Sequence, residues 1–526
     1  MILDPALTQP CTLAEMLIAA LQRHAGKPAF IDDERVITYA EIGERVGQAI
    51  EVFRTLGLVP GDAVVQLVGN RSEAFVIMMA CYVHGLRSVA LQTLGGEDDQ
   101  AFIIDDAQAR LVLVDATYQA RGVALQTRCG QAARWFSHGP AQGFDDFWAL
   151  ARTQVAQPLV CHGGAEDVIR LAYTGGTTGR PKGVMLSNRS LVTYTLLVQA
   201  GIDWPQDVRL ICTTPISHAA GSLILPTLLR GGLVVLQRGF DADAFIDAFE
   251  RHRCNVTFLV PTLVYALLDH PRTRRTDWTE MHTLIYSAAP MAPVRVREAL
   301  QVFGPCLVQL YGQTEAPNCV LALTQREHLL ANDERLASAG RPLPGLSVAL
   351  LDDTGQPVAA NGGSHAIGEI CVRGPLLMSG YWGQPELTAQ AFEGGWLHTG
   401  DMAWRDAQGY LYIVDRKKDM IISGGFNVYP KEVENVLTAH PAVAAAAVIG
   451  VPDAKWGEAV KAFVTLRPGH STDEATLIAL VRRAKGAVHT PKSIELTETL
   501  PLTALGKIDK KALRARYWSG SSRGVN

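Results

Sequence analysis

Hydrophobic and polar residues alternate along the first part of the chain with two different periods. Two runs with helical spacing follow a Thr-x-x-Glu sequence, at Thr12 and at Thr38, which is typical of a capped helix N-terminus. Residues 73–83 have the same helical spacing. Short apolar runs that predict strands occupy residues 63–68, 88–91, 110–114, 210–213, 233–236, 256–260, 283–287 and 306–311. This succession predicts an α/β sheet with helices on its faces.

The texture of the sequence changes after about residue 346. Short alternating strands are predicted at 347–351, 368–373 and 410–414, with turn-rich segments between them. Beyond Asp415, helices are predicted near 431–438 and 474–484, and strands at 443–449 and 459–466. We therefore predict an α/β fold with two domains: an N-terminal body, residues 1–415, made of α/β subdomains and a β-rich subdomain, and a small α+β domain, residues 416–526.

The composition is that of a folded globular protein. Of 526 residues, 48% are hydrophobic and 19% are charged, which excludes disordered, collagen-like and coiled-coil chains. The net charge of −4 gives no reason to expect a nucleic-acid partner. No apolar run is long enough to span a bilayer, and the N-terminus does not resemble a secretory signal. The nine cysteines form no C-x-x-C pair, which favours reduced thiols in the cytoplasm.

Charge is divided unevenly between the two predicted domains. From Arg416 onward there are 17 basic and 10 acidic residues, whereas the preceding body has 31 basic and 42 acidic residues. A basic domain beside an acidic body could close over an anionic ligand, or its charges could simply be solvated. Charge alone favours the second interpretation.

A glycine-rich loop is the strongest single feature of the sequence. Residues 174–183 read Thr-Gly-Gly-Thr-Thr-Gly-Arg-Pro-Lys-Gly. Free backbone N–H groups, paired hydroxyls and a nearby lysine are what a phosphate-binding loop requires. The loop lacks the Gly-Lys-Ser/Thr ending of a Walker A motif, in which the final hydroxyl binds Mg²⁺, so a metal ion would need another ligand.

This loop resembles the T-[S/G]-G-T-T-G-x-P-K-G signature of the adenylate-forming superfamily, with Gly175 at the position of the usual serine. Four more segments resemble motifs of that superfamily in the same order: Tyr-Gly-Gln-Thr-Glu at 311–315, Gly-Trp-Leu-His-Thr-Gly-Asp at 395–401, the hinge segment at 415–421, and Pro-Leu-Thr-Ala-Leu-Gly-Lys at 501–507. Five motifs in order, spread over most of the chain, identify a member of this superfamily. The acyl-CoA synthetase branch is the most similar.

The resemblance implies a site for ATP and Mg²⁺. It implies catalytic roles for Thr174, Lys182, Glu315 and Lys507, with Glu315 also the Mg²⁺ ligand. Tyr311 would stack on adenine, Asp401 and Arg416 would bind the ribose, and Lys507 would reach the α-phosphate. The full predicted set for ATP and AMP is Thr174, Gly175, Gly176, Thr177, Thr178, Gly179, Lys182, Ser287, Ala288, Ala289, Pro290, Gln309, Tyr311, Gly312, Gln313, Thr314, Asp401, Arg416 and Lys507.

The same resemblance implies an acid pocket, a coenzyme A tunnel and a hinge. The pocket residues are His218, Ala219, Gly221, Ala288, Gly312, Pro317 and Asn318, and their small side chains would leave volume for a sizeable acid. No charged residue among them could pair with an ammonium group, which argues against an amino-acid substrate. Gly424, Gly425 and Trp456 would border coenzyme A, although Trp456 could equally be a core residue. Lys418 would be the hinge of a mobile C-terminal domain.

We therefore expect an AMP-forming carboxylate–CoA ligase located in the cytoplasm. The acid would be a medium- or long-chain fatty acid, with a bulky aryl, terpenoid or steroid-derived acid as the next candidate. An enzyme that loads a carrier-protein thiol, and a non-catalytic adenylate-binding protein on the same fold, are the alternatives. The expected partners are the small-molecule acid, ATP and coenzyme A, and a homodimer is left open.

Overall fold

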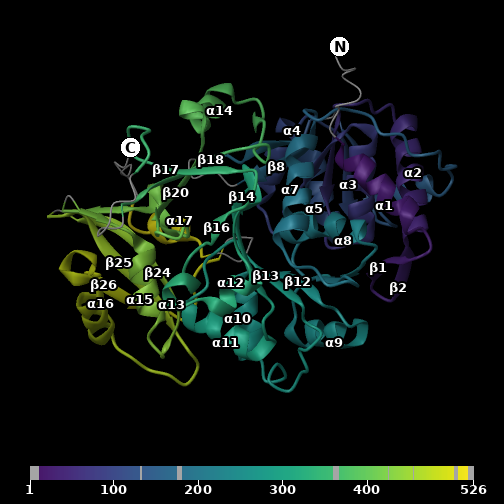
Figure 1. Cartoon of the computed structure of the whole chain (residues 1–526). Helices are drawn as coiled ribbons and strands as arrows, with labels where there is room; N and C mark the ends of the chain where they lie inside the picture. The colour runs from purple at the N-terminus through teal and green to yellow at the C-terminus, as the bar shows by residue number, and fades with distance from the viewer. Residues whose placement is uncertain are drawn as a thin grey trace, which may run out of the picture.

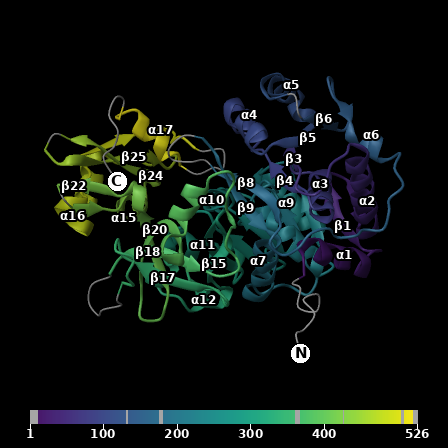
Figure 2. The same cartoon turned by 90° about the horizontal axis from the view of Figure 1, so that it is seen from above.

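The computed structural model describes residues 11–518, apart from 131–132, 175–179, 359–365, 425, 454 and 503–507. Two views show a large body and a smaller C-terminal domain lying side by side (Figures 1 and 2). The body contains the first two thirds of the chain and a β-rich subdomain. This arrangement matches the mixed α/β architecture that the sequence predicts.

Two large sheets with parallel central strands form the body. The nine-stranded sheet has the order β16 (Arg341–Pro342), β15 (Ala316–Leu323), β14 (Leu307–Gln313), β13 (Thr283–Tyr286), β12 (Val256–Leu259), β10 (Arg209–Cys212), β11 (Leu233–Leu236), β1 (Pro28–Asp32) and β2 (Arg35–Thr38). The eight-stranded sheet has the order β19 (Gly380–Tyr381), β9 (Lys182–Ser187), β8 (Val168–Thr174), β4 (Arg87–Ala90), β3 (Ala63–Leu67), β5 (Ala109–Asp115), β6 (Arg134–His138) and β7 (Asp145–Asp146).

Three layers of helices enclose these sheets. The layer between the sheets contains α1 (Leu13–Arg23), α2 (Tyr39–Thr55), α3 (Ser72–His84), α7 (Asn188–Gly201) and α8 (Ile224–Leu229), which share one apolar core with both sheets. The outer face of the eight-stranded sheet packs against α4 (Glu97–Asp106) and α5 (Gln119–Arg128). The outer face of the nine-stranded sheet packs against α9 (Ala242–His252), α10 (Pro261–Asp269) and α11 (Pro293–Phe303). The shorter helices of the body are α6 (Phe147–Ala151), α12 (Gln325–Leu330), α13 (Asp333–Leu336) and α14 (Pro385–Ala391).

Two smaller sheets follow along the chain. The β-rich subdomain is an antiparallel sheet in the order β17 (Ser347–Leu351), β18 (Gly368–Arg373), β20 (Leu397–Arg405) and β21 (Leu411–Arg416). The C-terminal domain has β22 (Ile421–Ser423), β23 (Phe426–Val428), β24 (Val443–Asp453), β25 (Gly457–Leu466) and β26 (Ser493–Leu496), with α15 (Pro430–Thr438), α16 (Glu474–His489) and α17 (Lys510–Ala515). The chain therefore leaves one sheet at Arg416 and enters the next at Ile421.

Both predicted helix caps are confirmed. The Thr12 hydroxyl accepts a hydrogen bond from the Glu15 N–H at 3.2 Å, and Thr12 N–H donates to the Glu15 carboxylate at 2.7 Å. Thr38 and Glu41 repeat this reciprocal pair. The predicted strands are also confirmed to within a few residues. Several strands were not predicted, among them β8 and β9, which lie on either side of the glycine-rich loop.

No helix in the described part of the chain has the length and hydropathy needed to cross a bilayer.

Gly221 shows how tightly the chain folds between β10 and α8. A Cβ atom at this position would lie 1.7 Å from the carbonyl oxygen of Ile216, which is backbone and cannot rotate away. Gly221 is buried in the helix layer between the two large sheets. The small residue is therefore required by the backbone itself, independently of any volume that a substrate needs.

We predict that Gly221→Ala lowers the melting temperature markedly or prevents folding, because the added methyl group must displace backbone. Gly26→Ala is the matched control, since a Cβ atom at exposed Gly26 meets no heavy atom within 4 Å. Thermal unfolding of both variants checks this. Equal melting temperatures would contradict the close approach described here.

Candidate active site

A buried carboxylate, Asp401 on β20, joins three strands. The Tyr311 hydroxyl on β14 donates to Oδ2 of Asp401 at 2.7 Å, and Nε of Arg416, the last residue of β21, lies 3.3 Å from Oδ1. Burial and the neighbouring Asp401 raise the pKa of Tyr311 well above its usual value, so its hydroxyl keeps the proton that it donates. Three residues predicted to bind nucleotide thus meet at one carboxylate that is only 6% exposed.

A glutamate that the sequence analysis did not single out holds the loop before Asp401. Glu369 on β18 accepts from the Gly400 N–H at 2.8 Å, and its other oxygen lies 3.1 Å from Nδ1 of His398 and 3.7 Å from Nζ of Lys417. Glu369 lies in a predicted strand, and His398 in a quoted motif. Their contact depends on strand register, which the sequence pattern does not give.

The glycine-rich loop connects two antiparallel strands. Thr174 ends β8 and Lys182 begins β9, and the two residues are cross-strand partners. The chain therefore returns after the loop to the same end of these two strands. Residues 175–179, which include most of the predicted phosphate ligands, lie outside the described residues.

Tyr381 connects this end of the two strands to Glu315. Nζ of Lys182 lies 5.5 Å from the centroid of the Tyr381 ring, and the Tyr381 hydroxyl donates to Oε1 of Glu315 at 2.9 Å. Burial first, and Glu315 second, raise the pKa of Tyr381 above its usual value. The predicted phosphate-binding lysine and the predicted Mg²⁺ ligand are therefore brought together by a tyrosine that no sequence motif had indicated.

The segment after β13 runs along the same end of the nine-stranded sheet. Ser287 is buried, whereas residues 288–290 are exposed. Ala288 has φ of +75°, a left-handed conformation that costs free energy in a residue other than glycine. Such strain is common where a loop contacts a ligand, and it fits the prediction that residues 287–290 border the nucleotide.

Three further predicted residues lie on or just after β14. Gln309 is buried, and its side-chain carbonyl accepts from the Tyr286 hydroxyl at 3.1 Å. Gln313 donates through Nε2 to the Thr399 carbonyl at 3.4 Å, which connects it to the Asp401 loop. Thr314 follows in the turn before β15.

Apart from Ala288, the predicted acyl residues fall into two groups. His218 and Ala219 belong to the segment that leads to Gly221, and Nδ1 of His218 lies 2.8 Å from the Ser217 hydroxyl. Pro317 and Asn318 lie on β15 next to Gly312. A Cβ atom at Gly312 would lie 2.6 Å from the backbone N of Asn318, so this glycine too is required by close backbone approach. Whether these groups bind an acid stays a prediction.

The predicted coenzyme A residues lie on the C-terminal domain. Gly424 has φ of +60°, and its N–H donates to the Trp456 carbonyl at 2.8 Å. Trp456 is 38% exposed, with Nζ of Lys455 4.8 Å and Nζ of Lys492 5.2 Å from its ring centroid. The alternative that Trp456 is a core residue is therefore wrong. Gly425 lies outside the described residues.

Charged pairs on either side of Lys418 attach to different domains. Arg416 pairs with Asp401, and Nζ of Lys417 lies 2.7 Å from Oδ1 of Asp353, so both cations contact the body. After Lys418, Asp419 accepts from Arg514 of α17 at 2.7 Å.

Helix α17 and strand β22 lie on different sides of the C-terminal domain. In both views α17, which begins three residues after Lys507, lies on the side nearer the body, whereas Figure 2 shows β22, which precedes Gly424, at the outer side. Lys507 itself lies outside the described residues.

Two family models match most of the chain. One, described as AMP-binding enzyme, matches residues 17–382, and the other, described as AMP-binding enzyme C-terminal domain, matches residues 432–507.

The curated relatives include the medium/long-chain-fatty-acid–CoA ligase FadD8 of Mycobacterium tuberculosis, 42% identical over 99% of this chain and 92% of that protein. A feruloyl-CoA synthase of an Amycolatopsis species is 39% identical over 91% of this chain and 94% of that protein.

Solved structures share the whole fold. The amide bond synthetase McbA from Marinactinospora thermotolerans has a TM-score of 0.88 at 34% identity, covering 96% of this chain and all of the other. ATP-bound MatB from Rhodopseudomonas palustris has a TM-score of 0.86 at 31% identity, covering 96% of this chain and 99% of that one. The predicted fold class is thus confirmed.

We predict that Tyr311→Phe weakens AMP binding as well as stability, because it leaves the buried Asp401 with one donor fewer. A hydrogen bond to a charged group contributes about 1.5–3 kcal/mol. Tyr412→Phe is the matched control, since the Tyr412 hydroxyl donates to Asp406 at 3.2 Å in the β-rich subdomain. Calorimetric titration with AMP and thermal unfolding separate the two effects. Equal AMP affinity in both variants would contradict the placement of Tyr311.

Proposed function

The chain belongs to the AMP-binding enzyme family and is an AMP-forming acid–thiol ligase, and on this premise we propose that it joins a medium- or long-chain fatty acid, or another bulky carboxylic acid, to coenzyme A. The observation that carries the proposal is a pair of clusters built on Tyr311, near the end of β14, and on Glu315, in the turn that follows β14. One is Tyr311, Asp401 and Arg416, and the other is Lys182, Tyr381 and Glu315. The first cluster suits a ribose and the second suits the anionic phosphates of ATP.

In the first half-reaction, a carboxylate oxygen of the acid attacks the α-phosphorus of ATP. The bond to the bridging oxygen breaks, so that pyrophosphate leaves and an acyl-adenylate remains. Thr174, Lys182 and the loop between them stabilise the departing phosphates, and Lys507 neutralises charge at the α-phosphate. These groups act by position and charge, and none is consumed.

The nucleoside is held by Asp401 and Tyr311. Each carboxylate oxygen of Asp401 already accepts one contact in the structure, and each retains a second lone pair for a ribose hydroxyl. The hydroxyl bond to Asp401 also fixes the plane of the Tyr311 ring, which would pack against adenine beside residues 287–290.

Glu315 fits a Mg²⁺ ligand by its chemistry. Mg²⁺ prefers carboxylate and phosphate oxygens, and the Tyr381 hydroxyl orients the Glu315 carboxylate on the side of Lys182. When bound, Mg²⁺ supplies positive charge to the phosphates. Glu315 supplies the anchor for that charge, and Lys182 supplies a second cation nearby.

In the second half-reaction, the thiol sulfur of coenzyme A attacks the acyl carbon, and AMP leaves with one oxygen of the original carboxylate. Gly424 lets a narrow pantetheine arm pass close to the backbone. Lys455 and Lys492 beside Trp456 would attract the phosphates of the nucleotide end. Since ATP and coenzyme A are the co-substrates, we propose a cytoplasmic reaction, and a homodimer stays a prediction.

A panel of carboxylic acids tests this function. We expect acid-dependent release of pyrophosphate and AMP, and formation of an acyl-CoA when coenzyme A is present. Medium- and long-chain acids and bulky aryl acids should react faster than acetate. A pantetheinylated carrier protein and an amine are the competing acceptors, and product formation only with one of these would reject coenzyme A as the natural thiol.

We predict that Glu315→Gln raises the Mg²⁺ concentration needed for half-maximal pyrophosphate release at least tenfold, because a neutral amide is a poor ligand for a hard cation. Glu327→Gln is the control, since Glu327 caps α12 elsewhere in the body. A Mg²⁺ titration at saturating ATP measures the shift. An unchanged requirement in Glu315→Gln would remove Glu315 from the metal site.

The two half-reactions need different faces of the C-terminal domain. Lys507 and Gly424 belong to the same small domain, and the neighbouring elements α17 and β22 lie on different sides of it (Figure 2). If Lys507 and Gly424 lie on different faces, both cannot reach one acyl-phosphate centre together. We propose that the domain boundary lies at residues 415–416 and that the domain rotates about Lys418 between the half-reactions.

Two substitutions test this rotation. Lys507→Ala should abolish adenylation but still convert added acyl-adenylate to acyl-CoA. Lys418→Pro should retain adenylation but slow thioester formation. Lys418 lies in the 3-10 turn Lys417–Asp419, whose φ proline can adopt, so proline would hold the hinge in this conformation. The half-reactions are measured separately, by pyrophosphate release and by thioester formation. Equal loss of both half-reactions in both variants would mean that these residues serve one fixed site.

A further inference from the structure

Two small cavities lie beside residues 216–222, which include the predicted acyl residues His218, Ala219 and Gly221. The first, of about 40 Å³, is lined by residues of α1, α3 and α7 and by Gly221 and Ser222. The second, of about 30 Å³, is lined by residues of β3, β4 and α3 and by Ile216 and Ser217. Both cavities thus touch the segment that carries the predicted acyl residues.

Two residues, Met78 and Arg170, line both cavities. Met78 has a flexible thioether side chain, and its displacement would join the two spaces into one chamber. Each space already exceeds the volume of about 10–15 Å³ that one water molecule needs. The chamber therefore has room for a terminal group of a few atoms without disturbing the core.

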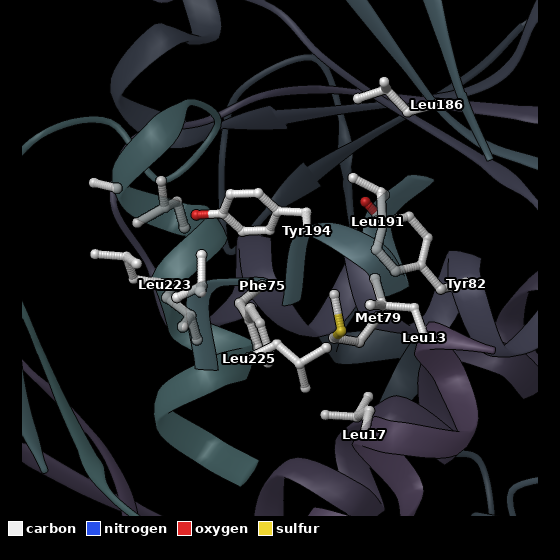
Figure 3. Close-up of a cluster of buried hydrophobic side chains, with 14 of the residues drawn as sticks. Leu13, Leu17, Phe75, Met79, Tyr82, Leu186, Leu191, Tyr194, Leu223 and Leu225 are labelled. Carbon is white, nitrogen blue, oxygen red and sulfur yellow. The ribbon is translucent and has the colours of Figure 1, made fainter. Parts of the chain in front are cut away.

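The first cavity is lined mainly by apolar side chains, and the second also by the polar side chains of Gln66, Ser88 and Ser217. Phe75, Met79, Tyr82, Leu191 and Tyr194, from α3 and α7, line the first cavity, and Figure 3 shows them within one cluster of buried side chains. The Ser222 hydroxyl donates to the Ala219 carbonyl at 2.5 Å, so Tyr194, 2.5 Å from the Ser222 oxygen, must be the donor in that pair. The hydroxyl protons of Tyr194 and Ser222 are therefore already committed to protein acceptors.

Arg170 on β8 is the cationic group in this wall. It donates through Nη2 to the Ser217 carbonyl. It also lies beside the Tyr82 hydroxyl: burial raises the pKa of Tyr82 to about 12, and Arg170 opposes that rise. Among the described residues, no carboxylate forms an ion pair with Arg170.

Arg295, a buried arginine, shows how a guanidinium with carboxylate partners is held in this protein. Arg295 on α11 lies 2.8 Å from Asp269 and 2.7 Å from Glu298, and so has two carboxylate partners. A guanidinium offers five N–H donors in a rigid plane, and the Ser217 carbonyl accepts from one of those of Arg170. Arg170 therefore has the positive charge and further N–H groups with which it could donate hydrogen bonds to an oxygen of a ligand.

We propose that the chamber receives the distal end of the acid, and that Arg170 donates hydrogen bonds to an acceptor oxygen on that end, either a ketone carbonyl or a second carboxylate. This inference rests on the acid–CoA ligase function proposed above and narrows its substrate class. The favoured acids carry an oxygen several bonds away from the reacting carboxylate, on an otherwise apolar framework.

Matched substrates and matched variants test the inference. Octanoic, 7-oxooctanoic and octanedioic acids differ only at the distal end, and butyric acid serves as a short substrate that would not fill the chamber. The wild type is compared with Arg170→Met and Arg170→Lys by kcat/KM for acyl-CoA formation. Arg134→Met, at an exposed arginine on β6, is the control for loss of one arginine.

We expect Arg170→Met to lower kcat/KM for the two oxygen-bearing acids at least about tenfold relative to octanoic acid, as the loss of a charged hydrogen bond predicts. Arg170→Lys should retain part of the preference, since it keeps the charge but not the planar fork. Butyrate turnover and Arg134→Met should be unaffected. A loss for octanedioic acid alone identifies a carboxylate ligand, and a loss for both identifies any acceptor oxygen.

The inference would be overturned if Arg170→Met left the ratio of kcat/KM for the oxygen-bearing acids to kcat/KM for octanoic acid unchanged, whether kcat/KM for all three acids fell equally or did not fall. If Arg170→Met does not fold, the same ratio in Arg170→Lys decides. A wild type that forms no acyl-CoA from any acid would instead reject the proposed function itself, and the two failures are therefore distinguishable.

Discussion

The contact of Asp401 with Tyr311 and Arg416 is the interaction on which the rest of the structure depends. The buried carboxylate accepts one donor from the nine-stranded sheet and one from the end of the β-rich sheet. A buried charge is stable only when its partners are in place, so this contact fixes both strands at the position where a ribose would bind. Glu369 strengthens it by holding Gly400 from the neighbouring strand.

The same contact fixes where the body ends. Arg416 is the last residue of β21, and Lys417 pairs with Asp353 of the β-rich subdomain, whereas Asp419 pairs with Arg514 of the C-terminal domain. A hydrogen bond also crosses the boundary: the Lys431 N–H at the start of α15 donates to the Asp415 carboxylate at 2.8 Å. A rotation of the C-terminal domain must break this bond while it leaves the Asp401 contact intact. The nucleotide site can therefore persist while the other domain changes its position.

Much of the fold could be predicted from the sequence because it is locally encoded. The Thr-x-x-Glu caps specify α1 and α2 within one turn of helix, and continuous apolar runs specify the buried parallel strands. The motifs identified Tyr311, Asp401 and Arg416, and the structure brings these three together. Glu369, Tyr381 and Arg170 escaped prediction because their roles depend on strand register and on contacts distant in sequence. Gly221 and Gly312 suggested room for a substrate, but the structure shows that backbone crowding requires a glycine at each position.

The central claim is that the site around Asp401 and Glu315 forms an acyl-adenylate. It can be tested by following one oxygen atom of the acid. When the acid carries ¹⁸O in its carboxylate, attack on the α-phosphorus places one labelled oxygen in the acyl-adenylate, bonded to phosphorus. When the thiol then displaces AMP, this labelled oxygen leaves with AMP. We predict AMP that contains one ¹⁸O per turnover, measured by mass spectrometry, together with unlabelled pyrophosphate. Formation of ADP with the label in inorganic phosphate would mean attack on the γ-phosphorus and would contradict the account.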